Sequence, residues 1–480
     1  MNKIAKNTFI ALINQLVNTI FPVIIFGYLA RLLSPSLLGE LSLSQSIASL
    51  LGMLVFIGLP IYGVREIAKC GKDKEQAKNI ISELFVLNVV IMITFYLIFV
   101  TIVELYLRTR MDVKLLYIVS IAVVISPFLM NYVIEGFEEF KFIAVRNVTV
   151  KLATLLVVIF VVKTKEDIYH YAWIYSLITL LTALYNINFI IKNIGFDIRH
   201  VRKEAIYLHL SKTKPIFITG IMSSVYIFTD QIMIGIISDT KNVANYAIAD
   251  KVIKIIVTTV AVVNIVMLPR VSSIRDETQK IKIRAERDLI CNAILFLCIP
   301  GVVGLLFISE AIVTLISGSQ YNLAITILKI IAINILIIPL TTFIYYQVCI
   351  PNSQEHKILV ATCFGALINI IGNLVFIPML GAVGAAYVTV FTEIIVLFVA
   401  IFMTREFLNP KVITNELWKR LMSSFLMVVF LYFYKKINLG EPYYSLILIF
   451  GACVIYIGSS YLLKDNILKS FFDKNRNESV

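Results

Sequence analysis

Apolar runs of about 20 residues recur along the whole chain, and they limit its fold more than any other feature of the sequence. A helix of about 20 residues crosses the hydrocarbon core of a bilayer, whereas outer-membrane barrels use strands of about ten alternating residues, which this sequence does not contain. Hydrophobic residues fill 59% of the 480 positions and charged residues only 15%, which is more apolar surface than a soluble core can bury. The sequence therefore predicts an all-α, polytopic membrane protein.

These runs predict about 14 transmembrane helices. The first seven are expected at 9–32, 41–60, 80–103, 115–134, 144–162, 168–191 and 215–237. The second seven are expected at 247–268, 289–308, 324–348, 358–377, 382–403, 421–434 and 443–463. The thirteenth run is the shortest, with about 14 apolar residues. The first run is interrupted by amides and has no small-residue cleavage site, so we expect it to stay in the protein.

Lysine and arginine are unevenly distributed between the predicted loops. Loops 65–78, 192–214 and 270–287 are basic, whereas the loops near Glu310 and Leu380 contain neither residue. Because cytoplasmic loops are enriched in Lys and Arg, both termini are predicted to lie in the cytoplasm of a cell membrane. Inside loops that face anionic lipid account for the net charge of +13, so no nucleic-acid partner is needed.

Three charged residues, Asp250, Lys251 and Lys254, fall in the first two turns of the eighth predicted span. A formal charge in hydrocarbon is costly, so charged side chains in spans usually face a protein interior or a water-filled cavity. This placement predicts a polar pathway. Asp250 and Lys254 are also i, i+4 neighbours on one helical face, and a local ion pair that neutralises both is an alternative that the sequence leaves open.

Other basic residues lie inside predicted spans or at their edges. Lys151 lies a turn or two inside the fifth span, where it cannot easily reach water. Arg31 and Lys329 lie near span ends, and their side chains can extend to the interface instead of entering a cavity. Lys151 is therefore a stronger candidate for a buried cation than either of these two.

Amides and carboxylates also occur within the spans. Asn14 and Asn18 fall near one face of the first helix, as expected for a helix that lines a cavity. Gln45 in the second span occupies the place of Asp250 in a weak internal similarity between the two halves of the chain. The carboxylates that could couple transport to a proton or sodium gradient, or pair with a buried lysine, are Asp230, Asp250 and Glu393.

Prolines inside the spans predict bends. Pro22, Pro127 and Pro339 fall in the first, fourth and tenth spans, and each removes a backbone donor from its helix. Bent or broken membrane helices are common where transporters hinge, although Pro is also frequent in membrane helices without such a role.

Sequence motifs for catalysis are absent. There is no P-loop, serine-nucleophile elbow or dinucleotide fingerprint. The four histidines are scattered at span ends and in loops, so neither a metal cluster nor a histidine proton relay within the membrane is predicted. The six cysteines form no C-x-x-C pair and are expected to be apolar fillers. We therefore expect a non-enzymatic protein without metal or cofactor, and the short outer loops also argue against a glycan polymerase or acyltransferase.

Six weak motifs in a fixed order give the chain a family resemblance. They are LARLLSPSLLGELSLSQS, IGLPIYGVREIA, EGFEEFKFIAVRN, FTDQIMIGIISD with NYAIADKVIKI and VMLPRVS, LISGSQYN and FIPMLGAVGAAYVTVFTEI. In this order the sequence resembles the polysaccharide flippases. These are the Wzx-type exporters of O-antigen or capsule repeat units, within the multidrug/oligosaccharidyl-lipid/polysaccharide exporter superfamily. The resemblance covers essentially the whole chain.

The resemblance implies two six-helix lobes around a central cavity, expected at 1–210 and 211–407, followed by two extra helices and a basic tail at 408–480. It also implies movement of a polyprenyl-pyrophosphate-linked oligosaccharide from the inner to the outer leaflet, without ATP hydrolysis by the protein. The expected partners are this lipid-linked substrate and membrane lipids, and other polysaccharide-assembly proteins are a further partner class consistent with the role. Nothing in the sequence predicts an assembly larger than a monomer.

Residue roles follow from the chemistry of such a substrate. Lys251 and Lys254 are the first candidates for phosphate contacts, followed by Lys151 and Arg31. The amides expected to line the path of the sugars are Asn14, Asn18 and Gln45. A multidrug/cation antiporter of the same superfamily and a lipid II flippase remain alternatives, although the in-span charge is mainly basic and disfavours cationic drugs.

Overall fold

The computed structural model describes residues 3–56, 58–71, 73–199, 201–272, 280–408, 411–435 and 443–468. Every regular element in these ranges is a helix, which confirms the predicted all-α class. The chain forms two compact units, Met1–Ala244 and Asn245–Val480. The expected domain boundaries after residues 210 and 407 stay predictions.

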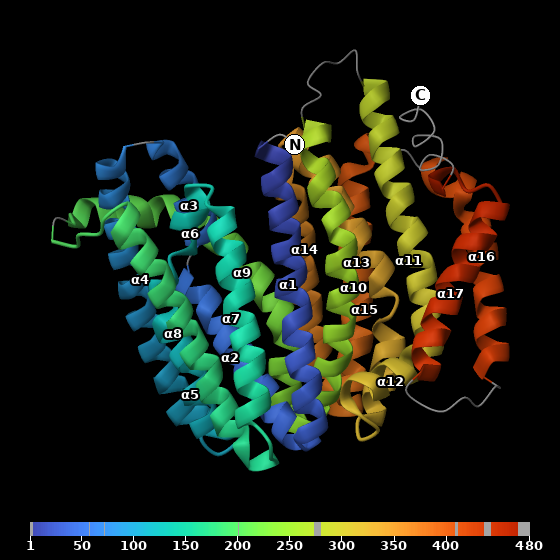
Figure 1. Cartoon of the computed structure of the whole chain (residues 1–480), viewed down its shortest axis with the longest axis horizontal. Helices are drawn as coiled ribbons and strands as arrows, with labels where there is room; N and C mark the ends of the chain where they lie inside the picture. The colour runs from blue at the N-terminus through green and yellow to red at the C-terminus, as the bar shows by residue number, and fades with distance from the viewer. Residues whose placement is uncertain are drawn as a thin grey trace. The chain divides into compact units, whose positions relative to one another are not determined.

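The first unit holds α1 to α9 (Figure 1). Their bounds are α1 Lys3–Leu32, α2 Pro35–Phe56, α3 Leu59–Cys70, α4 Lys74–Ile102, α5 Val113–Ile125, α6 Asn131–Gly136, α7 Phe140–Val161, α8 Ile168–Asn193 and α9 Lys203–Ile237. Short turns η1 Val103–Leu107, η2 Ser126–Leu129 and η3 Lys165–Asp167 adjoin them. Helix α2 packs against α5 and α9, α5 against α8, and α1 against α7.

The second unit holds the helices that follow. Their bounds are α10 Thr240–Ser272, α11 Lys280–Ser317, α12 Asn322–Ile331, α13 Asn334–Phe343, α14 Glu355–Leu380, α15 Ala382–Thr404, α16 Lys411–Lys435 and α17 Tyr443–Leu462. The short elements are η5 Ile344–Cys349, η6 Ile350–Asn352 and η7 Arg405–Phe407. Helix α14 packs against α15, and Figure 1 shows α16 beside both α11 and α17.

The helices match the predicted membrane spans. Among the described residues, ten helices are long and apolar enough to cross a membrane, and four shorter apolar helices accompany them. Each predicted span coincides with helical structure, so the polytopic architecture is confirmed. The short thirteenth run is part of a 25-residue helix, α16, because polar residues before the apolar run continue the same helix.

Two spans are interrupted, each near a predicted proline. In the fourth span α5 ends at Ile125, Pro127 lies in the first turn of the 3-10 helix η2, and Met130 has a left-handed backbone with φ 41°. In the tenth span α12 and α13 are separate helices, and Pro339 lies inside α13 just before the π-helix η5. By contrast, α1 continues as one helix across Pro22.

The last of the family-like motifs builds a tight helical hairpin. Gly381, with φ 59°, ends α14 at a backbone angle that suits glycine. Gly384 in the first turn of α15 lies so close to α14 that a Cβ atom there would stand 2.2 Å from the carbonyl oxygen of Phe376. Any larger residue at position 384 would push the two helices apart.

The two C-terminal helices are fixed to α11 by an apolar cluster and by polar bonds. Met427, Leu431 and Leu448 belong to this cluster with Phe296. The hydroxyl of Tyr456 donates to the carbonyl of Phe296 at 2.9 Å. Arg420 of α16 also pairs with Asp465 just after α17, at 3.0 Å between Nε and Oδ2, and both side chains are completely buried.

Candidate functional site

The charged turns of α10 form the centre of the candidate site. Lys254 donates from Nζ to Oδ2 of Asp250 at 2.7 Å, so the local ion pair allowed by their i, i+4 spacing is formed. The Lys254 side chain is 49% exposed and that of Asp250 19% exposed, which leaves the lysine accessible while the carboxylate is mostly covered. Lys251 is half-buried and lies three residues from Lys254, on the same face of the helix.

A hydrogen bond to α15 brings a second carboxylate to the level of this ion pair. The hydroxyls of Tyr246 on α10 and Thr389 on α15 lie 3.0 Å apart. Asp250 and Glu393 each follow one helical turn later, and the eighth and twelfth spans are predicted to cross in the same direction. Because each carboxylate is one turn from the same contact, Glu393 lies at about the depth of Asp250, and its side chain is buried. The second unit thus gathers two lysines and two carboxylates on neighbouring helices.

In the first unit, α1 and α7 bring Lys151 and Asn18 to one depth. The Tyr28 hydroxyl donates to the carbonyl of Val162 at 2.6 Å, which joins the two helices near their predicted outer ends. Lys151 precedes Val162 by 11 residues, about 16 Å along a helix. Counting the same 11 residues back from Tyr28 along α1 reaches position 17, so Asn18 lies at about the depth of Lys151. Both side chains are half-buried.

The remaining predicted residues of α1 differ in position. Arg31 is exposed in the last turn of α1, as its place near the span end led us to expect. Asn14 lies within the helix, but its side chain is outside the described residues. The exposed Lys329 occupies the last turn of α12.

Gln45 and Asp230 are brought into one polar region by the packing of α2 against α9. Gln45 is half-buried on α2. Its neighbour Ser46 donates to the side chain of Gln231 at 2.7 Å, and Gln231 follows the buried Asp230. This polar contact connects α2 and α9 inside apolar surroundings.

A buried arginine network was not predicted from the sequence. Arg146 of α7 is 4% exposed and donates to the side-chain oxygens of Asn131, Asn147 and Asn186. Asn186 of α8 in turn donates to the carbonyl of Leu129, at the interruption of the fourth span. The acceptors of Arg146 come from three segments, and no spacing in the sequence links them. Their arrangement braces the broken span against α7 and α8.

A buried histidine was also missed. His209 of α9 lies 2.8 Å from the hydroxyl of Tyr62 through Nδ1 and 3.0 Å from Glu83 through Nε2. Because a carboxylate only accepts, the Nε2–H of His209 donates to Glu83. The sequence placed His209 in the predicted loop 192–214, and only the fold brings α3, α4 and α9 around it.

The comparisons with known proteins agree on a family and a fold. The family model described as polysaccharide biosynthesis protein matches residues 4–275, more than half of the chain. A putative O-antigen transporter of Shigella dysenteriae is 24% identical over 393 residues, covering 82% of this chain and 97% of the relative. A putative O-antigen transporter of Escherichia coli strain K12 is 22% identical over 394 residues, covering 79% and 91%.

Solved structures share the fold at low sequence identity. The lipid II flippase MurJ in an inward closed conformation has a TM-score of 0.75 at 17% identity and covers 97% of this chain and 100% of its own. An inward-facing multidrug resistance MATE family transporter has a TM-score of 0.66 at 16% identity and covers 82% and 94%. The resemblance expected from the six motifs is thereby confirmed, and the chain belongs to the polysaccharide biosynthesis protein family.

Proposed function

We propose that the protein is a flippase that moves a polyprenyl-pyrophosphate-linked oligosaccharide from the inner to the outer leaflet of the cytoplasmic membrane, for the synthesis of a surface polysaccharide. Family membership, two O-antigen transporter relatives and a transporter fold support this function. Both termini lie in the cytoplasm in this proposal, as the distribution of Lys and Arg predicts. The protein acts without a cofactor and as a monomer.

The observation that carries the proposal is the cation pair on α10. Lys251 and Lys254 are i, i+3 neighbours, so their side chains can reach one ligand. Lys254 is neutralised by Asp250 at 2.7 Å, which lowers the cost of a lysine within a membrane helix. A pyrophosphate has more negative charge and more acceptor oxygens than one carboxylate. It can therefore replace Asp250 as the partner of Lys254 and gain Lys251 as a second partner.

The polar residues of the first unit suit the sugars. Hydroxyl groups need both donors and acceptors, which amides supply, and Asn18 and Gln45 are half-buried on α1 and α2. Lys151, at the depth of Asn18, adds a cation to this lining. Asp230 and Glu393 are the carboxylates whose protonation could couple the cycle to an ion gradient, and rocking of two lobes about bent helices would alternate access.

The basic character of these residues argues against the main alternative. A multidrug/cation antiporter needs acidic or aromatic contacts for its substrates, whereas Lys151, Lys251 and Lys254 would repel a cation. A lipid II flippase would share the cationic residues. The two functions differ in the lipid that accumulates when transport fails, which is lipid II in one case and the lipid-linked oligosaccharide in the other. The two relatives named as O-antigen transporters favour a surface-polysaccharide substrate.

The test is complementation of a deletion strain by Lys251→Ala, Lys254→Ala and the double variant. Lys241→Ala is the matched control, because Lys241 is an exposed lysine in the first turn of the same helix. Surface polysaccharide and the lipid-linked precursor on the cytoplasmic leaflet are measured at matched membrane levels of each variant. We expect the double variant to lose surface glycan and to trap precursor, while Lys241→Ala behaves as the parent. Normal surface glycan in the deletion strain, with altered sensitivity to cationic drugs, would refute the flippase proposal.

A further inference from the structure

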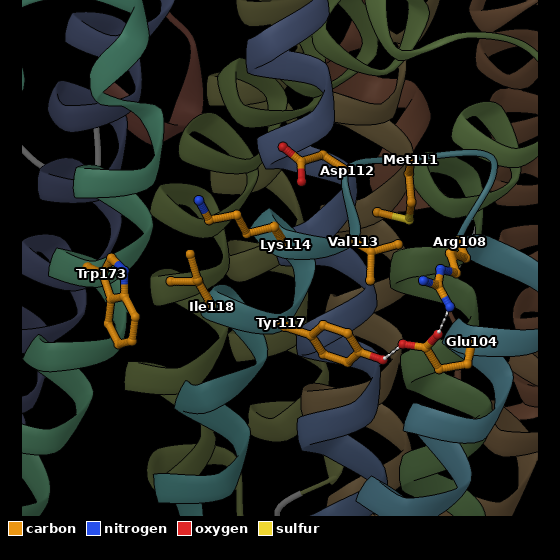
Figure 2. Close-up of a pocket in the computed structure, with 9 residues that line it drawn as sticks. All are labelled: Glu104, Arg108, Met111, Asp112, Val113, Lys114, Tyr117, Ile118 and Trp173. Atoms are coloured by element: carbon orange, nitrogen blue, oxygen red, sulfur yellow. Dashed lines mark hydrogen bonds and ion pairs between the residues drawn. The ribbon is translucent and has the colours of Figure 1, made fainter.

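A pocket of about 660 Å³ opens in the first unit where α4 ends, α5 begins and α8 passes (Figure 2). The residues that matter most for its chemistry are Glu104, Arg108, Asp112, Lys114, Tyr117 and Trp173. None of them belongs to the set considered above. The predicted loop 104–114 lies on the outer side of the membrane, so this pocket is at the outer interface if the predicted orientation holds.

One side of the pocket offers both donors and acceptors. Glu104 accepts from the hydroxyl of Tyr117 at 2.9 Å and from Nη1 of Arg108 at 3.1 Å. The Arg108 side chain is 73% exposed, and most of its five N–H groups remain available to a ligand. Each Glu104 oxygen also keeps lone-pair capacity. A planar guanidinium beside a carboxylate and a tyrosine ring suits the alternating donors, acceptors and apolar faces of a sugar.

The other side offers a cation. Lys114 places its ammonium over the ring of Tyr169 at 4.6 Å, and Figure 2 shows this side chain extending toward the side of the pocket where Trp173 lies. The nearby Asp112 is occupied, because Oδ1 accepts from the N–H of Leu115 at 3.0 Å and Oδ2 from the Tyr169 hydroxyl. An ammonium group only donates, so an anionic oxygen is its natural ligand here.

An apolar stripe on α8 starts at the pocket and leads away from it. Trp173 is 47% exposed and lines the pocket, and Leu177, Leu181 and Leu184 continue on the same exposed face of the helix. In a membrane this face lies against hydrocarbon chains. A Trp at the pocket end of this stripe is typical of the interface between headgroups and chains.

We propose that this pocket binds the sugar phosphate of a lipid-linked glycan in the outer leaflet. The phosphate lies at Lys114, the first sugar lies between Tyr117 and the Glu104–Arg108 pair, and the lipid chain follows the exposed stripe of α8. An ordinary phospholipid fits less well, because the pocket is far larger than one phosphate and its side with Glu104, Arg108 and Tyr117 suits the hydroxyls and faces of a sugar. The inference rests on the proposed function and orientation, and it adds an outer binding site for the transported lipid.

Trp173 provides a local reporter for the test, because the chain has only two tryptophans and the other is Trp418 on α16. The full-length Trp418→Phe protein in phosphatidylcholine nanodiscs is titrated with farnesyl-pyrophosphoryl-N-acetylglucosamine, and Trp173 emission is followed. Farnesyl pyrophosphate lacks the sugar, and dihexanoyl phosphatidylglycerol is an anionic phospholipid that has neither the sugar nor the pyrophosphate. We expect a saturable change with the glycosylated probe and a Kd about tenfold higher without the sugar.

Variants in the same background separate the two sides of the pocket. Lys114→Ala is expected to raise the Kd of both farnesyl probes about tenfold, whereas Arg108→Ala raises only that of the glycosylated probe. Arg110→Ala is the control, since Arg110 is an exposed arginine two residues away that does not line the pocket. Lys114→Gln removes the charge but keeps most of the side chain, and it replaces Lys114→Ala if that variant unfolds at lower temperature. Unchanged binding in the Lys114 and Arg108 variants, or equal binding of phosphatidylglycerol, would overturn the inference.

The result is independent of the test of the proposed function. Loss of surface glycan in the deletion strain, together with no saturable change of Trp173, would refute the pocket and leave the flippase. Saturable binding at Trp173, together with normal surface glycan in the deletion strain, would refute the flippase and leave a glycolipid-binding site.

Discussion

Removing the amide of Asn186 tests whether the Arg146 network holds the broken fourth span. In Asn186→Ala the buried guanidinium of Arg146 loses one acceptor, and a hydrogen bond to a charged group contributes about 1.5–3 kcal/mol. The carbonyl of Leu129 also loses its donor, which costs about 1 kcal/mol more. Arg146 still donates to Asn131 and Asn147, so its guanidinium keeps two of its acceptors. We therefore expect a loss of about 3 kcal/mol in the free energy of unfolding.

The assay is SDS-induced unfolding of the purified protein in detergent micelles, and circular dichroism monitors the loss of helix. Asn193→Ala is the matched control on the same helix, because the exposed Asn193 side chain donates only to the carbonyl of Phe189, one turn earlier. It should change the free energy of unfolding by less than about 0.5 kcal/mol.

A double-mutant cycle identifies the contact itself. Arg146→Met and Asn186→Ala should be non-additive by about 1.5 kcal/mol or more, since each removes the same hydrogen bond. Additive effects, or an Asn186→Ala protein as stable as the parent, would refute the claim that this bond braces the interruption at Pro127.

Two further variants probe packing in the second unit. Gly384→Ala would place a Cβ 2.2 Å from the Phe376 carbonyl oxygen, so we expect the free energy of unfolding to fall by about 3 kcal/mol or more in the same assay. The control Gly458→Ala, which has open space around it, should be neutral or slightly stabilising. Asp465→Asn leaves the completely buried Arg420 without its counter-charge and should destabilise the protein by about 3–5 kcal/mol. Faster cleavage by protease near α16 and α17 is the second measurement, and a variant as stable as the parent would contradict the role of this pair.

Local sequence patterns predicted the elements of the fold well. Membrane spans are defined by runs of apolar residues, and each span can be recognised without knowledge of its neighbours. The interruption at Pro127 was likewise predictable, because proline removes a helix donor wherever the helix packs. The Asp250–Lys254 pair was one of two stated interpretations, and its formation follows from i, i+4 spacing alone.

Contacts between distant segments could not be predicted in the same way. Arg146 was visible in a family-like motif, yet its acceptors Asn131 and Asn186 are 15 and 40 residues away. The depth shared by Asp250 and Glu393 depends on a single hydrogen bond between α10 and α15. Hydrophobic periodicity selects which face of a helix is buried but does not specify which polar side chains meet there.

The partners of the buried cations differ in a way that bears on their roles. Arg420 pairs with the fully buried carboxylate of Asp465. Arg146 donates to amides on two other helices, Asn131 and Asn186, so both arginines are held by groups that a ligand could not replace without disrupting contacts between helices. Lys254 has a partner from its own helix, on a side chain that is half exposed. Both members of that pair lie on one helix, so a ligand can replace Asp250 as the partner of Lys254 without breaking a contact between helices. A cation that must accept and release a phosphate in each transport cycle needs a partner of this replaceable kind, which is why we propose the substrate contact on α10 rather than at the better-paired arginines.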